Sequence, residues 1–183
     1  PETPVTNTFF IFNLFITFVL KAKIHNYFYF ASNNQTFGKM NNDFRCNCPI
    51  TSALDIVGDK WTLVIIKQML LEGKKTFKDF FESDEAIASN ILSSRLKMLE
   101  EFKIISKEKL PYNKKTNIYL LTEKGIGLTP TIVELTLWSD GNIREHHSSL
   151  QSDNRIEMVK KNKEETIKMI VKSYKQNTGY NNT

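Results

Sequence analysis

The chain has 183 residues, of which 40% are hydrophobic and 25% charged, so it can bury the core of one compact domain and is not expected to be disordered throughout. The net charge of +5 permits a polyanionic partner but does not require one. Cys46 and Cys48 are too few and too close together for a disulfide framework, which argues against a disulfide-stabilised secreted protein and favours a reducing, cytoplasmic setting.

Residues 1–39 differ from the rest of the chain, because they hold eight of the 13 phenylalanines and only one acidic residue, Glu2. The apolar run from Phe9 to Leu20 is shorter than the roughly 20 residues that a membrane anchor needs. Basic residues follow this run, whereas in a signal peptide they precede it. We therefore prefer a third interpretation, in which translation starts at Met40 and residues 1–39 are not part of the folded domain.

Two helices are expected next. The first is short and capped by Thr51 or Ser52, and the second spans residues 60–71, with Asp59 as its cap and Gly73 as its end. The second helix is apolar around most of its circumference, which indicates that it lies at the centre of the core. The inward side of the first helix carries Ala53, Leu54, Ile56 and Val57.

A helix-turn-helix pattern follows. Residues 76–81 predict a short helix, residues 83–85 a turn, and residues 90–102 a longer helix with Ser89 as its cap. One face of the longer helix is apolar, and the opposite face is short, polar and basic. The apolar face holds Leu92, Leu96 and Leu99, and the polar face holds Asn90, Ser93, Ser94 and Lys97. Such side chains suit a helix in the DNA major groove, although a core helix with a polar back has a similar pattern.

Two strands are predicted after this helix, over residues 104–110 and 118–121, joined by a loop over residues 111–117. The loop carries Lys114 and Lys115. A hairpin straight after a recognition helix is a wing, and its lysines would lie against the phosphate backbone or in the minor groove. A solvated loop is the alternative, but the position after the helix favours a DNA contact.

The C-terminal part is predicted to be helical. Five large apolar residues lie within seven positions, Ile132, Val133, Leu135, Leu137 and Trp138. They are too many for one stripe against a small domain, which indicates a partner subunit, with a fully buried helix as the alternative. After a polar connector with His146 and His147, Asp153 is suited to cap a last helix with a basic polar face. This helix is interpreted as a solvated extension, an extra dimer contact or a weak DNA contact, in that order.

Several strings in this order carry a family resemblance: Gly58-Asp59-Lys60-Trp61-Thr62, Arg95-Leu96-Lys97-Met98-Leu99-Glu100-Glu101 and Tyr119-Leu120-Leu121-Thr122-Glu123-Lys124-Gly125. The region from Cys48 to Ser139 resembles the HxlR-type transcriptional regulators. The resemblance implies a bacterial winged helix-turn-helix homodimer with a MarR-like fold that binds an inverted-repeat operator on double-stranded DNA. Some family members sense electrophiles or oxidants through a cysteine in the N-terminal arm, directly before a proline. Cys48, which precedes Pro49, matches this position.

The sequence departs from the family at residues 83–86, where a glycine-containing turn is usual. We therefore expect an altered turn, with two acidic residues, Asp84 and Glu85, near the phosphate path. For Cys48, a small buried hydrophobic residue is the alternative to a sensor. No catalytic or phosphate-binding motif is apparent, and the Cys46/Cys48 pair lacks the usual spacing of a zinc site, so we expect no enzyme activity, metal or cofactor.

The sequence thus predicts a mainly α fold with a small β-hairpin wing (α+β), a dimeric winged helix-turn-helix in the cytoplasm, associated with the nucleoid and not with membranes. Residues 40–141 are expected to form the DNA-binding and dimerisation domain, and residues 142–183 a connector and an amphipathic C-terminal helix. The alternative is a winged-helix protein–protein interaction module. The predicted DNA-contacting residues are Ser89, Asn90, Ser93, Ser94, Arg95, Lys97, Lys114 and Lys115, and the predicted redox-sensing residue is Cys48.

Overall fold

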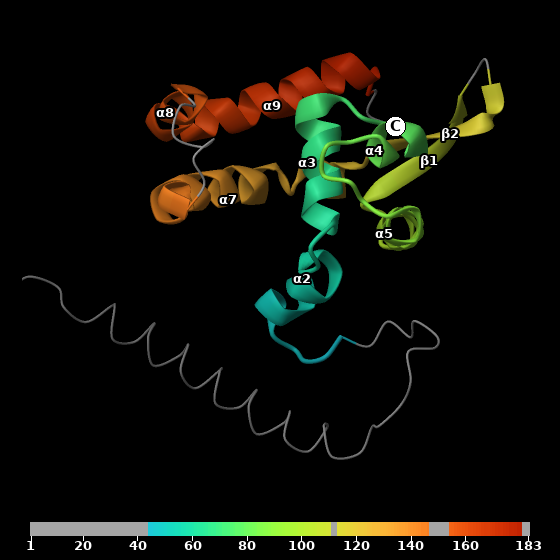
Figure 1. The fold of residues 1–183 in the computed structure, drawn as a ribbon, viewed down its shortest axis with the longest axis horizontal. Coiled ribbons are helices and arrows are strands. Elements are labelled where there is room, and N and C mark those ends of the chain that lie inside the picture. Colours follow the sequence, from blue (N-terminus) through green and yellow to red (C-terminus); the bar gives the residue numbers. More distant parts are fainter. Residues whose placement is uncertain (1–43, 111–112, 147–153, 181–183) are drawn as a thin grey trace, which may run out of the picture. The chain divides into compact units, whose positions relative to one another are not determined.

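The computed structural model describes residues 44–110, 113–146 and 154–180 (Figure 1). The helices and strands follow in the order α2 (Pro49–Val57), α3 (Thr62–Glu72), α4 (Phe77–Phe81), α5 (Ser89–Glu101), β1 (Ile105–Leu110), β2 (Asn113–Leu121), α6 (Glu123–Ile126), α7 (Thr129–Asn142), a 3-10 turn (Arg144–His146), α8 (Asn154–Lys161) and α9 (Lys163–Thr178). This is the predicted mainly helical fold with one antiparallel hairpin. The predicted leader, residues 1–39, and the predicted cap Asp153 lie outside the described residues.

The chain divides into two compact units after Asp59. In the first unit α2 begins at Pro49 with Cys48 as its N-cap, so the predicted caps were placed too late. Proline is favoured at the first helical position, because it has no N–H that would be left without a partner there. Ser52 lies in the first turn, where its hydroxyl donates a hydrogen bond to the Cys46 carbonyl oxygen at 3.3 Å.

The expected inward side of α2 is wrong for the single chain, since none of the residues of this helix is buried. Ala53 and Leu54 are exposed, and Ile56 and Val57 are half-buried. The physical reason is that the spacing of apolar residues shows which side of a helix is apolar, but not whether another part of the chain covers that side.

In the second unit α3 is the central helix, as predicted. Ile65, Ile66 and Met69 on it have 0–1% of their surface exposed. Its N-cap is Trp61, two residues after the predicted Asp59, and it ends at Gly73 in the left-handed conformation with φ of 67°. Glycine adopts this conformation without steric cost. α7 and α9 contact each other and both contact α3 (Figure 1).

The hairpin is longer than predicted. β1 pairs with β2 from Ile105 opposite Leu121 to Leu110 opposite Asn113. Residues 113–117, predicted as a loop, therefore belong to β2. An irregularity between Lys109 and Leu110 shifts the register, so that Lys109 lies opposite Asn117 and Leu110 opposite Asn113.

The apolar residues of α7 are only partly covered. Ile132 and Val133 are buried, whereas Leu135 and Trp138 are 45% and 58% exposed. The alternative of a fully buried helix is therefore not met. Among the described helices, none combines the length and the hydropathy that crossing a bilayer requires.

The last helical segment consists of two helices, α8 and α9, separated at Asn162. Ile156 and Tyr174 are buried at 7% and 4% exposure. α9 thus packs onto the domain through contacts with α3 and α7, and a solvated extension does not fit.

Candidate nucleic-acid interface

The inner face of α5 packs against the core through the three leucines that were predicted to lie on it. Leu92 and Leu99 are fully buried, and Leu96 is 2% exposed. Burial of three leucines contributes roughly 1.5–3 kcal/mol each, which is enough to fix which face of α5 points outward.

The outer face of α5 is open to solvent. It consists of Ser89, Asn90, Ser93, Ser94 and Lys97. The Lys97 side chain is 79% exposed, and its Nζ lies 3.7 Å from an Oε1 of Glu101. Both charges are exposed, so this ion pair is weak and leaves the ammonium available to a phosphate. Arg95 is half-buried at the side of the helix.

The predicted cap of α5 is displaced by one residue. Ala88 is the N-cap, in an extended conformation, and Ser89 is the first helical residue. The helix begins one residue earlier than predicted because the preceding turn already ends at Ala86. Ile87 then enters the core at 1% exposure, and Ala88 is the N-cap. Ser89 remains exposed at the N-terminus of the helix.

The turn before α5 contains no glycine, yet Ala86 adopts a left-handed conformation with φ of 53°. The Ala86 N–H donates to the Ser83 carbonyl oxygen at 3.0 Å, and the buried Ser83 hydroxyl donates to the Phe80 carbonyl oxygen at 2.6 Å. For a residue with a Cβ this conformation costs about 1–2 kcal/mol. The turn thus carries local strain at a residue other than glycine.

Glu85 in this turn is attached to α3. Its carboxylate pairs with Lys67 and accepts a hydrogen bond from Gln68 Nε2 at 2.6 Å. Burial acts to raise the pKa of Glu85, but these hydrogen bonds outweigh burial and lower it to about 2. Of the two acidic residues expected near the phosphate path, Glu85 is thus neutralised by a partner, and Asp84 is exposed.

The wing carries Lys114 and Lys115 as exposed residues on β2, rather than on a loop. Its base is tied to the end of α5. The Thr122 hydroxyl donates to the Lys103 carbonyl oxygen at 2.7 Å, and Lys124 Nζ donates to the Phe102 carbonyl oxygen at 3.0 Å. α5 and the hairpin are therefore joined by two hydrogen bonds at the base of the wing.

A third extended segment joins the hairpin, which the sequence did not reveal. Thr76 forms an isolated bridge with Ile118, and the Tyr119 N–H donates to the Lys75 carbonyl oxygen at 2.7 Å. The segment is too short to show a strand pattern. In the sequence it is only a polar stretch between Gly73 and Phe77, and such a stretch fits any linker equally well.

In the first unit, Cys48 is half-buried at the N-terminus of α2, and Cys46 is also half-buried. The Cys48 side chain makes no regular capping hydrogen bond. The backbone N–H and the hydroxyl of Thr51 nevertheless face the thiol and, with the N–H of Ile50, lower the pKa of Cys48. Within the described residues no group of three or more His, Cys, Asp or Glu side chains is placed to hold a metal ion.

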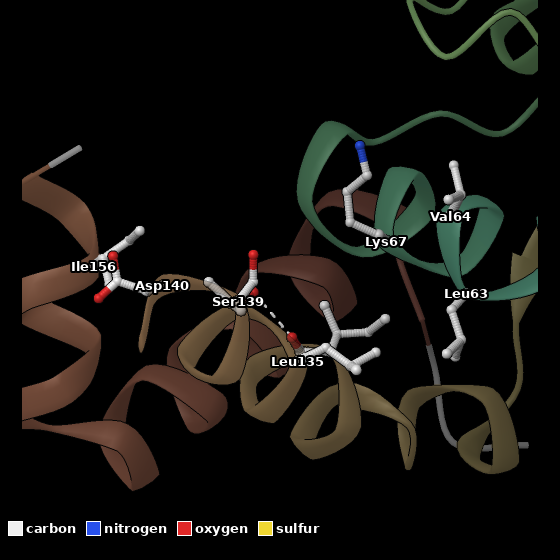
Figure 2. A pocket seen from close by; sticks show the side chains of 9 residues that line it. Leu63, Val64, Lys67, Leu135, Ser139, Asp140 and Ile156 are labelled. Atoms are coloured by element: carbon white, nitrogen blue, oxygen red, sulfur yellow. Dashed lines mark hydrogen bonds between the residues drawn. The ribbon is translucent and has the colours of Figure 1, made fainter. Parts of the chain in front are cut away.

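A groove of about 350 Å³ lies between α3, α7 and α8 (Figure 2). Its walls are mainly apolar and include Leu63, Leu135 and Ile156. Lys67 lines it as well, with its amino group turned away from Leu135 (Figure 2). The sequence did not predict this groove, because its three walls come from helices far apart along the chain.

Comparison with known proteins places the same region in one family. A sequence model described as HxlR-like helix-turn-helix matches residues 56–147. The HTH-type transcriptional regulator YodB of Bacillus subtilis is 37% identical over 94 residues, which cover 51% of this chain and 83% of YodB. An uncharacterised HTH-type transcriptional regulator of the same organism, YybR, is 30% identical over 95 residues, or 52% of this chain and 75% of YybR.

Solved structures give similar matches. The reduced form of YodB is 36% identical with a TM-score of 0.44, and covers 52% of this chain and 93% of YodB. The redox regulator HypR in its oxidised form is 30% identical with a TM-score of 0.46, and covers 52% of this chain and 97% of HypR. α8 and α9 lie beyond the residues that the family model matches.

Proposed function

The chain belongs to the HxlR-like helix-turn-helix family and is a DNA-binding transcriptional regulator, and from this premise we propose that α5 reads an operator in the major groove while the hairpin contacts the adjacent backbone. The observation that carries the proposal is the outer face of α5. It is exposed, neutral to basic and held outward by three buried leucines. A protein–protein interaction module has no need of such a face followed by a lysine-bearing wing.

Each side chain is assigned a role by its chemistry and position. Asn90, Ser93 and Ser94 have short polar groups that suit base edges, and Lys97 suits a phosphate. Ser89 lies at the N-terminus of the helix, where backbone N–H groups favour a phosphate. Three further side chains are assigned to the phosphate backbone: Arg95 from the side of the helix, and Lys114 and Lys115 from the wing.

We further propose that the protein acts in the bacterial cytoplasm as a homodimer on an inverted repeat. Support comes from large apolar side chains that the single chain leaves open, Leu135 and Trp138 on α7 and Ile50 and Leu54 on α2. A two-fold axis would place two α5 helices about 34 Å apart, one helical turn of DNA, so that they contact half-sites on the same face.

The test is a mobility shift with an operator selected from genomic DNA. Ser94→Ala combined with Lys97→Ala should weaken specific binding at least tenfold, since each base or charged contact contributes roughly 1–3 kcal/mol. The matched control is Ser173→Ala with Lys172→Ala, which removes the same two kinds of exposed side chain from α9. Equal affinities of the two double variants would contradict the assignment of α5.

Cys48 is proposed as a sensor of electrophiles or oxidants. Its thiol has a lowered pKa at the start of α2 and is not buried, so the thiolate is both more populated and accessible. The relative YodB has been solved in forms described as quinone-bound and diamide-treated.

For the sensor, operator release by diamide or a quinone is compared between the unmodified protein, Cys48→Ser and Cys46→Ser. Release should be lost in Cys48→Ser. It should be kept in Cys46→Ser, the control, because this variant removes the neighbouring thiol and retains Cys48. Release that is the same in all three proteins would remove Cys48 from the mechanism.

A further inference from the structure

The outer edge of β2 is where the C-terminal helix meets the wing. Backbone N–H groups alternate along a strand between its two edges. The Thr122 N–H donates to the Ile104 carbonyl oxygen on the β1 side, so the N–H groups of Tyr119 and Leu121 point to the opposite edge. Tyr119 finds the Lys75 carbonyl oxygen there. Leu121 is fully buried, and its N–H therefore needs another acceptor.

That acceptor is the hydroxyl of Tyr174 on α9. The Leu121 N–H donates to Tyr174 Oη at 2.6 Å, across 53 positions of the chain. Tyr174 is 4% exposed, and burial raises the pKa of its hydroxyl to about 12, so it stays neutral over the physiological range. Beside it, Lys175 Nζ lies 2.5 Å from an Oε1 of Glu123 on α6.

Leu121 is also the root of the wing. It pairs with Ile105 at the start of β1, and the next residue, Thr122, is bonded to the end of α5. Lys114 lies next to Asn113, which pairs with Leu110 at the far end of β1, five positions from Ile105. At about 3.3 Å per residue this is roughly 17 Å from the root. A tilt of about 10° at the root would move Lys114 by roughly 3 Å, which is enough to break a contact with a phosphate.

From this arrangement we propose that Tyr174 is a positioning residue for the wing, and that α9 sets the angle at which Lys114 and Lys115 meet DNA. The inference rests on the proposed function, because it assumes that these lysines contact DNA. It goes beyond that function, since α9 lies outside the residues matched by the family model and adds a determinant of DNA affinity that α5 and the wing do not contain.

The first measurement is DNA affinity and its salt dependence for Tyr174→Phe, which keeps the ring and removes the acceptor. Binding should weaken about threefold to tenfold, and the slope of log K against log salt should shrink by up to about 1.8, the value for two lost phosphate contacts. The matched control is Tyr180→Phe, which removes a hydroxyl from the same end of the chain and leaves the Leu121 bond in place. It should bind like the unmodified protein.

A double-mutant cycle separates positioning from general destabilisation. If Tyr174 acts through the wing, its substitution should add little to the loss already caused by Lys114→Ala with Lys115→Ala. With Asn90→Ala on α5, the two losses should simply add. Additivity with the wing variants, or an unchanged affinity of Tyr174→Phe, would overturn the proposal.

Amide hydrogen exchange in the free protein gives a readout that needs no DNA. In Tyr174→Phe the Leu121 amide should exchange at least tenfold faster, while amides in the middle of α3 keep their rates. If the unmodified chain binds no DNA, the proposed function fails. In that case an unchanged exchange rate of the Leu121 amide in Tyr174→Phe would still refute the positioning role. Should Tyr174→Phe be unfolded, Lys175→Glu takes its place, because it sets two carboxylates together at the same joint without disturbing a buried group.

Discussion

The charge of Glu85 links the turn before α5 to α3, and Glu85→Gln removes that charge while keeping the shape of the side chain. Gln68 Nε2 can still donate to the new amide oxygen, and Lys67 keeps its pair with Glu72. Lys67 and Gln68 therefore each keep at least one partner in the variant. The substitution measures the electrostatic part of the link between this turn and α3.

The magnitude follows from the pKa of Glu85, which lies at about 2 instead of the ordinary 4.5. At about 1.4 kcal/mol per pKa unit this difference corresponds to roughly 3 kcal/mol. The Glu85 side chain is 29% exposed, so solvent screening reduces the expected loss in unfolding free energy to about 1–2 kcal/mol at pH 7.

The pH dependence has a definite sign. Because folding lowers the pKa of Glu85, its stabilisation is fully present above pH 4.5 and is lost as the pH falls towards about 2. Urea unfolding of the unmodified protein and of Glu85→Gln should therefore differ by a constant amount from pH 7 to pH 5, and by less than half of it at pH 3. Glu82→Gln is the control, since Glu82 is 61% exposed and lies 3.7 Å from Lys78, and it should cost less than about 0.5 kcal/mol. A difference for Glu85→Gln that does not change with pH would refute the reasoning.

Two further predictions concern backbone geometry. Ala86→Gly should stabilise the protein by about 0.5–1 kcal/mol in urea unfolding, because glycine relieves the left-handed strain at a small entropic cost, and a destabilised variant would contradict this account. Gly125→Ala should cost about 1–3 kcal/mol, because its Cβ would lie 2.3 Å from the Ile104 carbonyl oxygen. Gly141→Ala, whose Cβ would meet nothing within 4 Å, should not destabilise, and equal losses in both variants would contradict the contact with Ile104 as the cause.

Features that depend on local chemistry could be predicted from the sequence. The apolar stripe of α5 follows from helical periodicity, and Gly73 ends α3 because glycine accepts a positive φ. Thr122 caps α6, a local pattern in which a threonine hydroxyl accepts from the N–H of the third residue after it, here Gly125 at 3.4 Å. These positions need no information beyond a few neighbouring residues.

Features that depend on distant partners could not be predicted. The sequence predicts Glu85 near the phosphate path, and only the packing of the turn onto α3 shows that Lys67 neutralises its charge and that Gln68 donates to it. The periodicity of the last helix does not reveal the acceptor role of Tyr174, because this role depends on an amide 53 positions away. The left-handed conformation of Ala86 could not be predicted, because alanine does not favour a positive φ and only the surrounding contacts impose it.

The paired outer edge of β2 also bears on how these molecules behave at high concentration. An open strand edge with free N–H groups is a template on which a strand of another molecule can add, and this is a common route to aggregation. Near the base of the wing, the Lys75 carbonyl and the Tyr174 hydroxyl already occupy the N–H groups of Tyr119 and Leu121. Lys75 and the C-terminal helix therefore close these two N–H groups to the addition of a strand from another molecule.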